Sequence, residues 1–224
     1  SFATWPGGLS TLVNQILIDA DVDVRTSTSV ESVRKLINGR YQIAEINGNI
    51  IEVDAVVLAV PARVAANLIR SLSQNAAHIL EKIRFASVAT VLVSYPLEVA
   101  TELRALKATG LLVPSTGGRL LKAATFLTTK WSHFADPQFF LMRLSSGRVD
   151  EREIEKLEDS ELVARLHNDL VDATGINAEP IEYFVQRWPD AMPQLEIGHL
   201  ELVANARKEL ENYPGVLLTG ASYD

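Results

Sequence analysis

The sequence contains no cysteine and is short of basic residues. The absence of cysteine excludes a disulfide, a thiolate nucleophile and a cysteine metal site. It is typical of a cytosolic protein. The 21 Lys and Arg are outnumbered by 28 Asp and Glu, which gives a net charge of −7. A nucleic-acid surface needs clustered cations to neutralise phosphates, so this composition argues against a DNA or RNA partner.

Long apolar runs are also missing. The longest, at residues 55–60 and 86–93, have the length of strands and are too short to span a membrane. The N-terminus has no basic region before an apolar core, so we predict no signal peptide. The ends of the chain do not resemble the edges of a finished domain, and we expect a piece of a longer protein. Apolar residues at 47% and charged residues at 22% indicate a globular chain.

Sequence patterns of known catalytic chemistry are absent. No G-x-G-x-x-G fingerprint of a dinucleotide site occurs, and Ser145-Ser146-Gly147 does not form a nucleophile elbow. The four histidines have no metal-ligand spacing, so we expect them to face solvent or to cap helices. We therefore assign no metal site and no catalytic side chain.

Two Asn-Gly pairs mark the N-terminal part. They separate three strands, predicted at residues 29–37, 40–46 and 49–55, and favour type I′ hairpin turns. A helix is predicted to precede this meander, with Leu9, Leu12, Val13, Ile16 and Leu17 at helical spacing. The continuous apolar run at 56–60 predicts a parallel strand buried on both faces.

The rest of the sequence indicates an α+β fold. After a helix at 61–72, with Val64, Leu68 and Ile69 inward, strands are predicted at 87–95, 111–113, 120–128 and 139–144. A helix at 161–173, a strand at 181–188, a helix at 199–211 and a short strand at 215–219 follow. The middle of the chain therefore predicts a mostly antiparallel sheet with helices on one side.

Four cations lie near the aromatic residues of this middle region. Arg119, Lys122, Lys130 and Arg143 either meet carboxylates of a ligand or form a solvated face. Trp188 stands beside Pro189 at the end of a predicted strand. A large ring held there suits the wall of a flat cofactor as well as a surface role.

Several segments together resemble a known family. They are residues 5–13 (Trp-Pro-Gly-Gly-Leu-Ser-Thr-Leu-Val), 54–61 (Asp-Ala-Val-Val-Leu-Ala-Val-Pro), 110–114, 125–131, 187–194 (Arg-Trp-Pro-Asp-Ala-Met-Pro-Gln) with Gly198-His199, and 218–224. The first two resemble FAD-dependent amine-oxidase-like flavoproteins. The whole set resembles oxygen-dependent protoporphyrinogen or coproporphyrinogen oxidases, and the block at 187–199 is the most specific part.

The resemblance implies roles for seven positions. Val30, Trp188 and Gly220 match cofactor-binding positions, at the adenine, beside the flavin and before a flavin loop. Gly110 and Leu112 match substrate-pocket positions. Thr125 and Arg143 lie on neighbouring strands at similar positions, and Arg143 suits a substrate propionate.

The resemblance also implies a chemistry and a domain plan. It implies FAD held without a covalent bond and a porphyrinogen oxidised to the porphyrin in haem biosynthesis, with O₂ reduced to hydrogen peroxide. Residues 1–61 and 187–224 would belong to an FAD-binding domain, and 62–186 to a substrate-binding domain. We expect this chain alone to be inactive, and the enzyme to be cytoplasmic, with peripheral attachment to a membrane left open. The alternatives are another FAD-dependent amine oxidase or desaturase, and a non-catalytic α+β ligand-binding module.

Overall fold

The computed structural model describes residues 3–104, 106–149 and 151–223 and divides into two compact units. The sheet unit is Ser1–Asp23 with Ala86–Met192, and the meander unit is Val24–Phe85 with Pro193–Asp224. Asp224, which closes the last segment of the resemblance, lies outside the described residues. These bounds differ from those of the predicted domains, 1–61, 62–186 and 187–224, whose division between cofactor and substrate stays a prediction.

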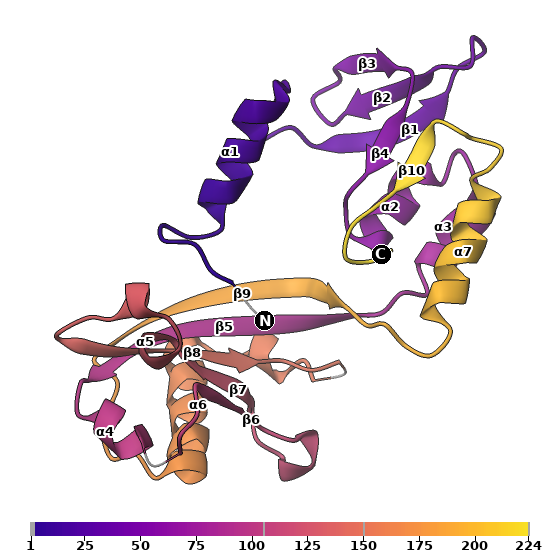
Figure 1. Cartoon of the computed structure of the whole chain (residues 1–224). Coiled ribbons are helices and arrows are strands. Elements are labelled where there is room, and N and C mark those ends of the chain that lie inside the picture. Colours follow the sequence, from indigo (N-terminus) through magenta and orange to yellow (C-terminus); the bar gives the residue numbers. More distant parts are fainter. Residues whose placement is uncertain (1–2, 105, 150, 224) are drawn as a thin grey trace. The chain divides into compact units, whose positions relative to one another are not determined.

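The predicted three-stranded meander is confirmed. Strands β1 (Val30–Lys35), β2 (Tyr41–Glu45) and β3 (Ile50–Val53) pair antiparallel in that order (Figure 1). The two Asn-Gly turns are present, but the predicted type I′ geometry is wrong. Gly39 and Gly48 have φ of 85° and 88°, whereas neither asparagine is among the described residues with positive φ.

Each of these turns has a three-residue loop. The amide of Gly39 donates to the carbonyl of Leu36, and that of Gly48 donates to the carbonyl of Glu45. Each glycine is the left-handed residue that follows a type I turn, as in a hairpin with a G1 bulge. The side chains of Asn38 and Asn47 accept the amide two residues further on, at 3.0 and 2.9 Å. An asparagine before the glycine therefore stabilises this turn as well as the type I′ turn.

A short parallel pair continues the meander unit. Strands β4 (Val56–Leu58) and β10 (Val216–Leu218) pair in parallel, as the apolar run predicted. Burial on both faces is wrong, because Val57 is 57% and Leu217 is 54% exposed. Only one face packs against the helices α2 (Ala62–Ile69), α3 (Gln74–Leu80) and α7 (His199–Glu209). Val64, predicted to point inward, is also exposed, and small alanines of α2 take the buried positions instead.

The sheet unit is built on five strands in the order β6-β7-β8-β5-β9. They are β5 (Phe85–Pro96), β6 (Gly110–Leu112), β7 (Leu121–Phe126), β8 (Phe139–Ser146) and β9 (Glu182–Pro193). The helices of this unit are α1 (Ser10–Ala20), α4 (Val99–Arg104), α5 (Leu127–Lys130) and α6 (Asp159–Thr174), with 3₁₀ turns at Ser115–Gly117, Ser132–Phe134 and Glu153–Glu155. No described helix combines the length and the apolarity that crossing a membrane requires.

The two faces of this sheet differ. Alternate residues of β5, β7 and β8, such as Val93, Phe126 and Met142, are fully buried and share a core with Leu166 and Leu170 of α6. Figure 1 shows α6 beside this sheet. The intervening residues, which we call the open face, include the exposed Leu92 and Arg143.

One predicted surface residue lies inside this core. His167 of α6 is 7% exposed, contrary to the expectation that the histidines face solvent or cap helices. Its Nδ1 lies 3.1 Å from the hydroxyl of the buried Tyr95, and its Nε2 lies 3.3 Å from Glu179. Burial raises the pKa of Tyr95 well above its ordinary value, so this phenol stays neutral.

Candidate functional site

The open face of the sheet unit brings together the residues predicted to bind substrate. Gly110 of β6 pairs with Thr125 of β7, Thr125 pairs with Arg143 of β8, and Arg143 pairs with Leu92 of β5. The four residues therefore form one row across neighbouring strands that lie about 4.8 Å apart. We call them the cross-strand row.

A shallow hollow lies at the β6 end of this row. Its volume is about 240 Å³, and it is lined by Thr109, Gly110, Leu111, Leu112, Ala123, Ala124, Thr125 and Lys130. Three of the four predicted substrate residues thus line one hollow, and the fourth, Arg143, is the strand neighbour of Thr125. Leu112 is 85% exposed, so its side chain offers a free apolar surface beside the hollow.

The close approach of two strands at the hollow leaves room only for a glycine at position 110. A Cβ atom at this position would lie 2.4 Å from the carbonyl oxygen of Ala124, a distance that real Cβ atoms do not reach. Glycine therefore lets β6 approach β7 closely. The close approach explains why a glycine stands at the start of the Gly-Leu-Leu-Val-Pro segment.

The surroundings of the cationic side chains near the cross-strand row differ from one residue to the next. Among the described residues Arg143 makes no ion pair, and its guanidinium is exposed on the open face. The ammonium of Lys130 lies 4.6 Å from the centroid of the Trp131 ring. Arg119 lies 4.0 Å from Asp172, at the limit of an ion pair. Arg143 is thus the cation of the cross-strand row that is placed to meet a carboxylate on a ligand.

Trp188 lies in a second hollow of the sheet unit, with a volume of about 220 Å³. The ring is 49% exposed. The other lining residues are Ser87, Val88, Ile154, Glu155, Arg187 and Pro189. An exposed indole in a mostly apolar hollow provides a flat surface for an aromatic ligand.

Polar contacts fix the backbone on both sides of Trp188. Arg187 bonds Asp159 at 2.6 Å and the carbonyl of Leu157 at 2.7 Å, and it also donates to the carbonyl of Ile154. After Pro189, the amide of Asp190 donates to Ser87 Oγ at 3.0 Å, and Ser87 donates to Glu155 at 2.5 Å. The sequence reasoning missed these supporting residues, since nothing in their spacing links residue 87 to residue 190.

The other two predicted cofactor residues belong to the meander unit. Val30 is the first residue of β1 and is 38% exposed. Gly220 has φ of 105° and follows β10, and no atom lies within 4 Å of the position of a Cβ. The residue before it, Thr219, donates to the carbonyl of Leu58, so Gly220 lies at the carboxyl end of the parallel pair.

The C-terminal turn is packed against β4. The amide of Tyr223 donates to the carbonyl of Gly220 at 2.8 Å, and its hydroxyl donates to Val60 O at 3.0 Å. Burial raises the pKa of Tyr223 to about 12. The carboxyl ends of parallel strands are the usual place for ligands in α/β sheets, so the position of Gly220 suits a cofactor contact.

These residue types fit a flavin nucleotide in part. Trp188 would contact a flat ring. Gly220 has no side chain, so a ligand can approach its backbone. Val30 begins a strand, so its backbone groups could contact a ligand. A glycine-rich phosphate loop is absent from the sequence. Among the described residues, no group of three His, Asp or Glu side chains is placed to hold a metal ion.

A scan against protein families and comparisons with known proteins give a consistent result. The family model described as flavin-containing amine oxidoreductase matches residues 2–224. The chain is 29% identical to a coproporphyrinogen III oxidase of Bacillus subtilis over 226 residues, covering 100% of this chain and 47% of that protein. It is 30% identical to protoporphyrinogen oxidase 1 of Arabidopsis thaliana chloroplasts, covering 95% of this chain and 42% of that protein.

The fold also matches a solved structure. A crystal structure from Exiguobacterium sp. 255-15, assigned as a protoporphyrinogen oxidase, superposes with a TM-score of 0.85 at 24% identity. The match covers 99% of this chain and 48% of the other. This likeness supports the fold. The chain spans about half the length of the curated relatives it matches.

Proposed function

We propose a function from one premise, that the chain belongs to the flavin-containing amine oxidoreductase family. The chain is part of an FAD-dependent oxidase that converts coproporphyrinogen III or protoporphyrinogen IX to the porphyrin. The names of the relatives from Bacillus subtilis and Arabidopsis thaliana support this class of substrate. The observation that carries the proposal is the cross-strand row, because it joins the hollow at Gly110, Leu112 and Thr125 to the exposed guanidinium of Arg143.

The row suits the chemistry of a porphyrinogen. Such a molecule has an apolar tetrapyrrole body and propionate carboxylates at its rim. Leu112 and Leu92 would contact the body, and Arg143 would pair with one propionate. A bidentate guanidinium contact fixes the orientation of the ring as well as its position.

Cofactor contacts are proposed for three residues, each taken from the resemblance. Trp188 would contact the flavin ring, Val30 would contact the adenine, and Gly220 would lead into a flavin-binding loop. When bound, the flavin would accept hydride from a methylene bridge of the porphyrinogen and reduce O₂ to hydrogen peroxide. The protein needs to position two rings and to exclude water, which agrees with the lack of an acid–base motif in the sequence.

The proposal also covers the cofactor's attachment, the electron acceptor and the location of the enzyme. FAD is held without a covalent bond, O₂ is the acceptor, and the complete enzyme works in the cytoplasm. The exposed faces of Val57 and Leu217 fit a covering layer in the complete protein, because parallel sheets are normally covered on both faces. The 224-residue chain by itself is expected neither to bind FAD tightly nor to turn over substrate, and titration with FAD checks this.

Aerobic turnover of the complete protein tests the proposal. Purified protein with FAD is mixed with each porphyrinogen, and porphyrin absorbance and hydrogen peroxide are followed together. The proposal predicts that both appear at a rate well above the enzyme-free control. Peroxide formed from primary amines and not from either porphyrinogen would favour the amine-oxidase alternative. A complete protein that takes up no FAD would favour the ligand-binding module.

A further inference from the structure

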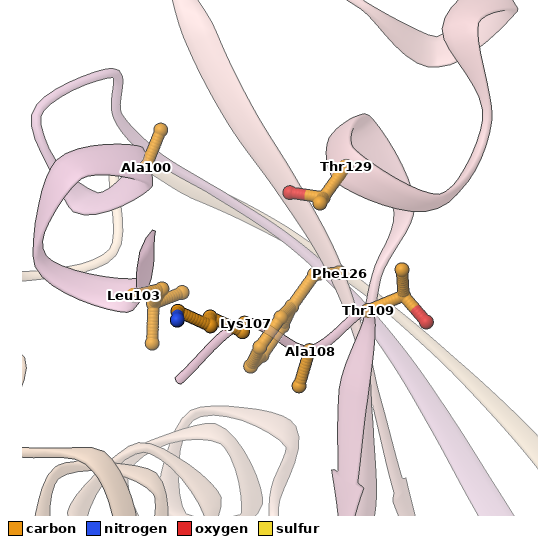
Figure 2. Close-up of a pocket in the computed structure, with 7 residues that line it drawn as sticks. All are labelled: Ala100, Leu103, Lys107, Ala108, Thr109, Phe126 and Thr129. Carbon is orange, nitrogen blue, oxygen red and sulfur yellow. The ribbon is translucent and has the colours of Figure 1, made fainter. Parts of the chain in front are cut away.

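A third hollow of the sheet unit lies apart from the cross-strand row. Its volume is about 360 Å³. It is lined by Ala100 and Leu103 of α4, by Lys107, Ala108 and Thr109 before β6, and by Phe126 and Thr129 around α5 (Figure 2). Of these residues, only Thr109 also lines the hollow at Gly110.

The base of this cavity is apolar. Phe126 is fully buried, Leu103 is 4% exposed, and Ala100 packs against the core of the sheet unit. A ligand that enters would therefore place its own apolar atoms against buried hydrocarbon. Burial of such surface is favourable because it removes apolar area from water.

Among the described residues that line the cavity, Lys107 is the charged one. Among the described residues Lys107 makes no ion pair or hydrogen bond, so its ammonium is available to a ligand. Figure 2 shows the Lys107 nitrogen next to Leu103. It also shows the Thr129 hydroxyl pointing toward Ala100. An ammonium and a hydroxyl at the rim of an apolar cavity provide the donors that a carboxylate accepts.

The backbone holds Lys107 in an unusual conformation. Its φ is +48°, in the left-handed region that side chains with a Cβ rarely adopt. Lysine offers no local hydrogen bond that would favour this region, unlike asparagine or aspartate. In this conformation Lys107 is one of the residues that line the cavity.

We propose that this cavity binds a monocarboxylate with an apolar body. One ammonium balances one negative charge, whereas a phosphate dianion would need more donors than the described lining residues offer. At the roughly 30 Å³ that a water-sized group occupies, the cavity holds about 12 non-hydrogen atoms, the number in decanoate. This site is independent of the proposed porphyrinogen function, since Phe126 lies on the buried face of the sheet and the cross-strand row lies on the open face.

Calorimetric titration of the 224-residue chain tests the proposal, with decanoate as the probe near neutral pH. Decanoate is expected to bind saturably, and decylammonium, which has the same tail and the opposite charge, to bind at least about tenfold more weakly. Lys107→Met is expected to weaken decanoate binding by about tenfold or more, and Lys107→Arg to keep it within about threefold. Lys122→Met, which removes an exposed cation of β7 outside the cavity, is the matched control and should bind as the unchanged chain does.

A second variant separates a lost ligand site from a lost fold. Ala100→Leu adds apolar atoms to the wall of the cavity and should remove decanoate binding while the circular dichroism spectrum and the unfolding midpoint are kept. The proposal is overturned if decanoate does not bind at about millimolar concentration. It is also overturned if Lys107→Met binds decanoate as tightly as the unchanged chain, or if decylammonium binds as tightly as decanoate.

Discussion

Arg143 is the residue on which the proposed substrate contact depends most. Its guanidinium is exposed and has no ion-pair partner among the described residues, so a neutral side chain should hardly change the stability of the fold. In the complete enzyme, Arg143→Gln is expected to lower kcat/KM for the porphyrinogen by about tenfold, since one charge-assisted hydrogen bond is lost. Arg143→Lys should recover part of this loss.

Steady-state kinetics on the complete flavoenzyme measure this effect. The matched control is Lys122→Gln, because Lys122 is an exposed cation on the neighbouring strand and lines no described hollow of the open face. Equal kcat/KM values for Arg143→Gln and the unchanged enzyme would remove Arg143 from the substrate site.

Trp188 carries the proposed flavin contact in the sheet unit. Replacing the ring by alanine removes an aromatic surface that is 49% exposed, so retention of flavin should weaken by about tenfold while the fold persists. Absorbance at about 450 nm after extensive dialysis of the complete protein reports the flavin that remains. Trp131→Ala, which removes a partly buried indole in tilted contact with the Phe134 ring, is the control and should retain flavin. Flavin content that is the same in Trp188→Ala and the unchanged protein would count against the contact.

Tyr223 gives a pH-dependent contribution to stability. Its folded pKa of about 12 lies above the ordinary tyrosine value, so its contribution is complete below about pH 10. It is lost as the pH rises from about 10 to 12, because the unfolded chain ionises first. Tyr223→Phe loses the hydrogen bond to Val60 and should be less stable by about 1 kcal/mol near neutral pH.

Urea unfolding at a series of pH values tests this contribution. The difference between Tyr223→Phe and the unchanged chain should shrink above about pH 10. Tyr183→Phe, at an exposed tyrosine of β9, should show no such trend. A difference that stays constant up to about pH 11 would mean that Tyr223 ionises equally in both states.

The sequence predicts the strand on which a residue lies more readily than it predicts the residue's neighbours on other strands. Gly110, Thr125 and Arg143 were assigned to neighbouring strands, but their alignment in one row depends on strand register, which the sequence does not encode locally. His167 was expected at the surface because its spacing resembles no metal site. Its burial depends on Tyr95 and Glu179, which lie on other segments of the chain.

At the scale of elements, the positions of most helices and strands could be predicted and their detailed geometry could not. The Asn-Gly pairs located both hairpins, yet the turn type differs because Ile37 and Ile46 join the loops and only the glycines adopt positive φ. The helix α3 was missed. Its sequence, Gln-Asn-Ala-Ala-His-Ile-Leu, is short and has no strong apolar periodicity. Its alanines are buried because they pack in the core of the meander unit.

The β6–β7 pair provides a direct test of element packing. Gly110→Ala would place a Cβ 2.4 Å from the carbonyl oxygen of Ala124, so the strands must separate. We expect a loss of about 1–3 kcal/mol in the free energy of unfolding, as for other overpacked sites. Gly117→Ala is the matched control, because the nearest atom to its Cβ would be 3.8 Å away, and it should change stability by less than about 0.5 kcal/mol. Urea unfolding measures both, and equal stabilities would contradict the close approach.

At the scale of the whole molecule, the α+β class and the family could be predicted from the sequence, and the compact units could not. The predicted substrate domain begins at residue 62, whereas the compact unit that contains α2 and α3 runs from Val24 to Phe85, so the boundary of the packing unit differs from the boundary predicted for the functional domains. The exposed Val57 and Leu217 show that the described residues of the meander unit cover one face of the parallel pair and leave the other open. Since the chain spans about half the length of its relatives, the enzymatic account concerns the complete protein.

Reduction of the flavin in the absence of oxygen is the measurement that tests the central claim most directly. The complete protein, loaded with FAD, is mixed anaerobically with coproporphyrinogen III, with protoporphyrinogen IX or with buffer, and absorbance at about 450 nm is followed. The account predicts rapid bleaching by at least one porphyrinogen, recovery of the absorbance when O₂ is admitted, and much slower bleaching in the Arg143→Gln variant. A fully loaded flavoprotein whose absorbance changes with neither porphyrinogen would contradict it.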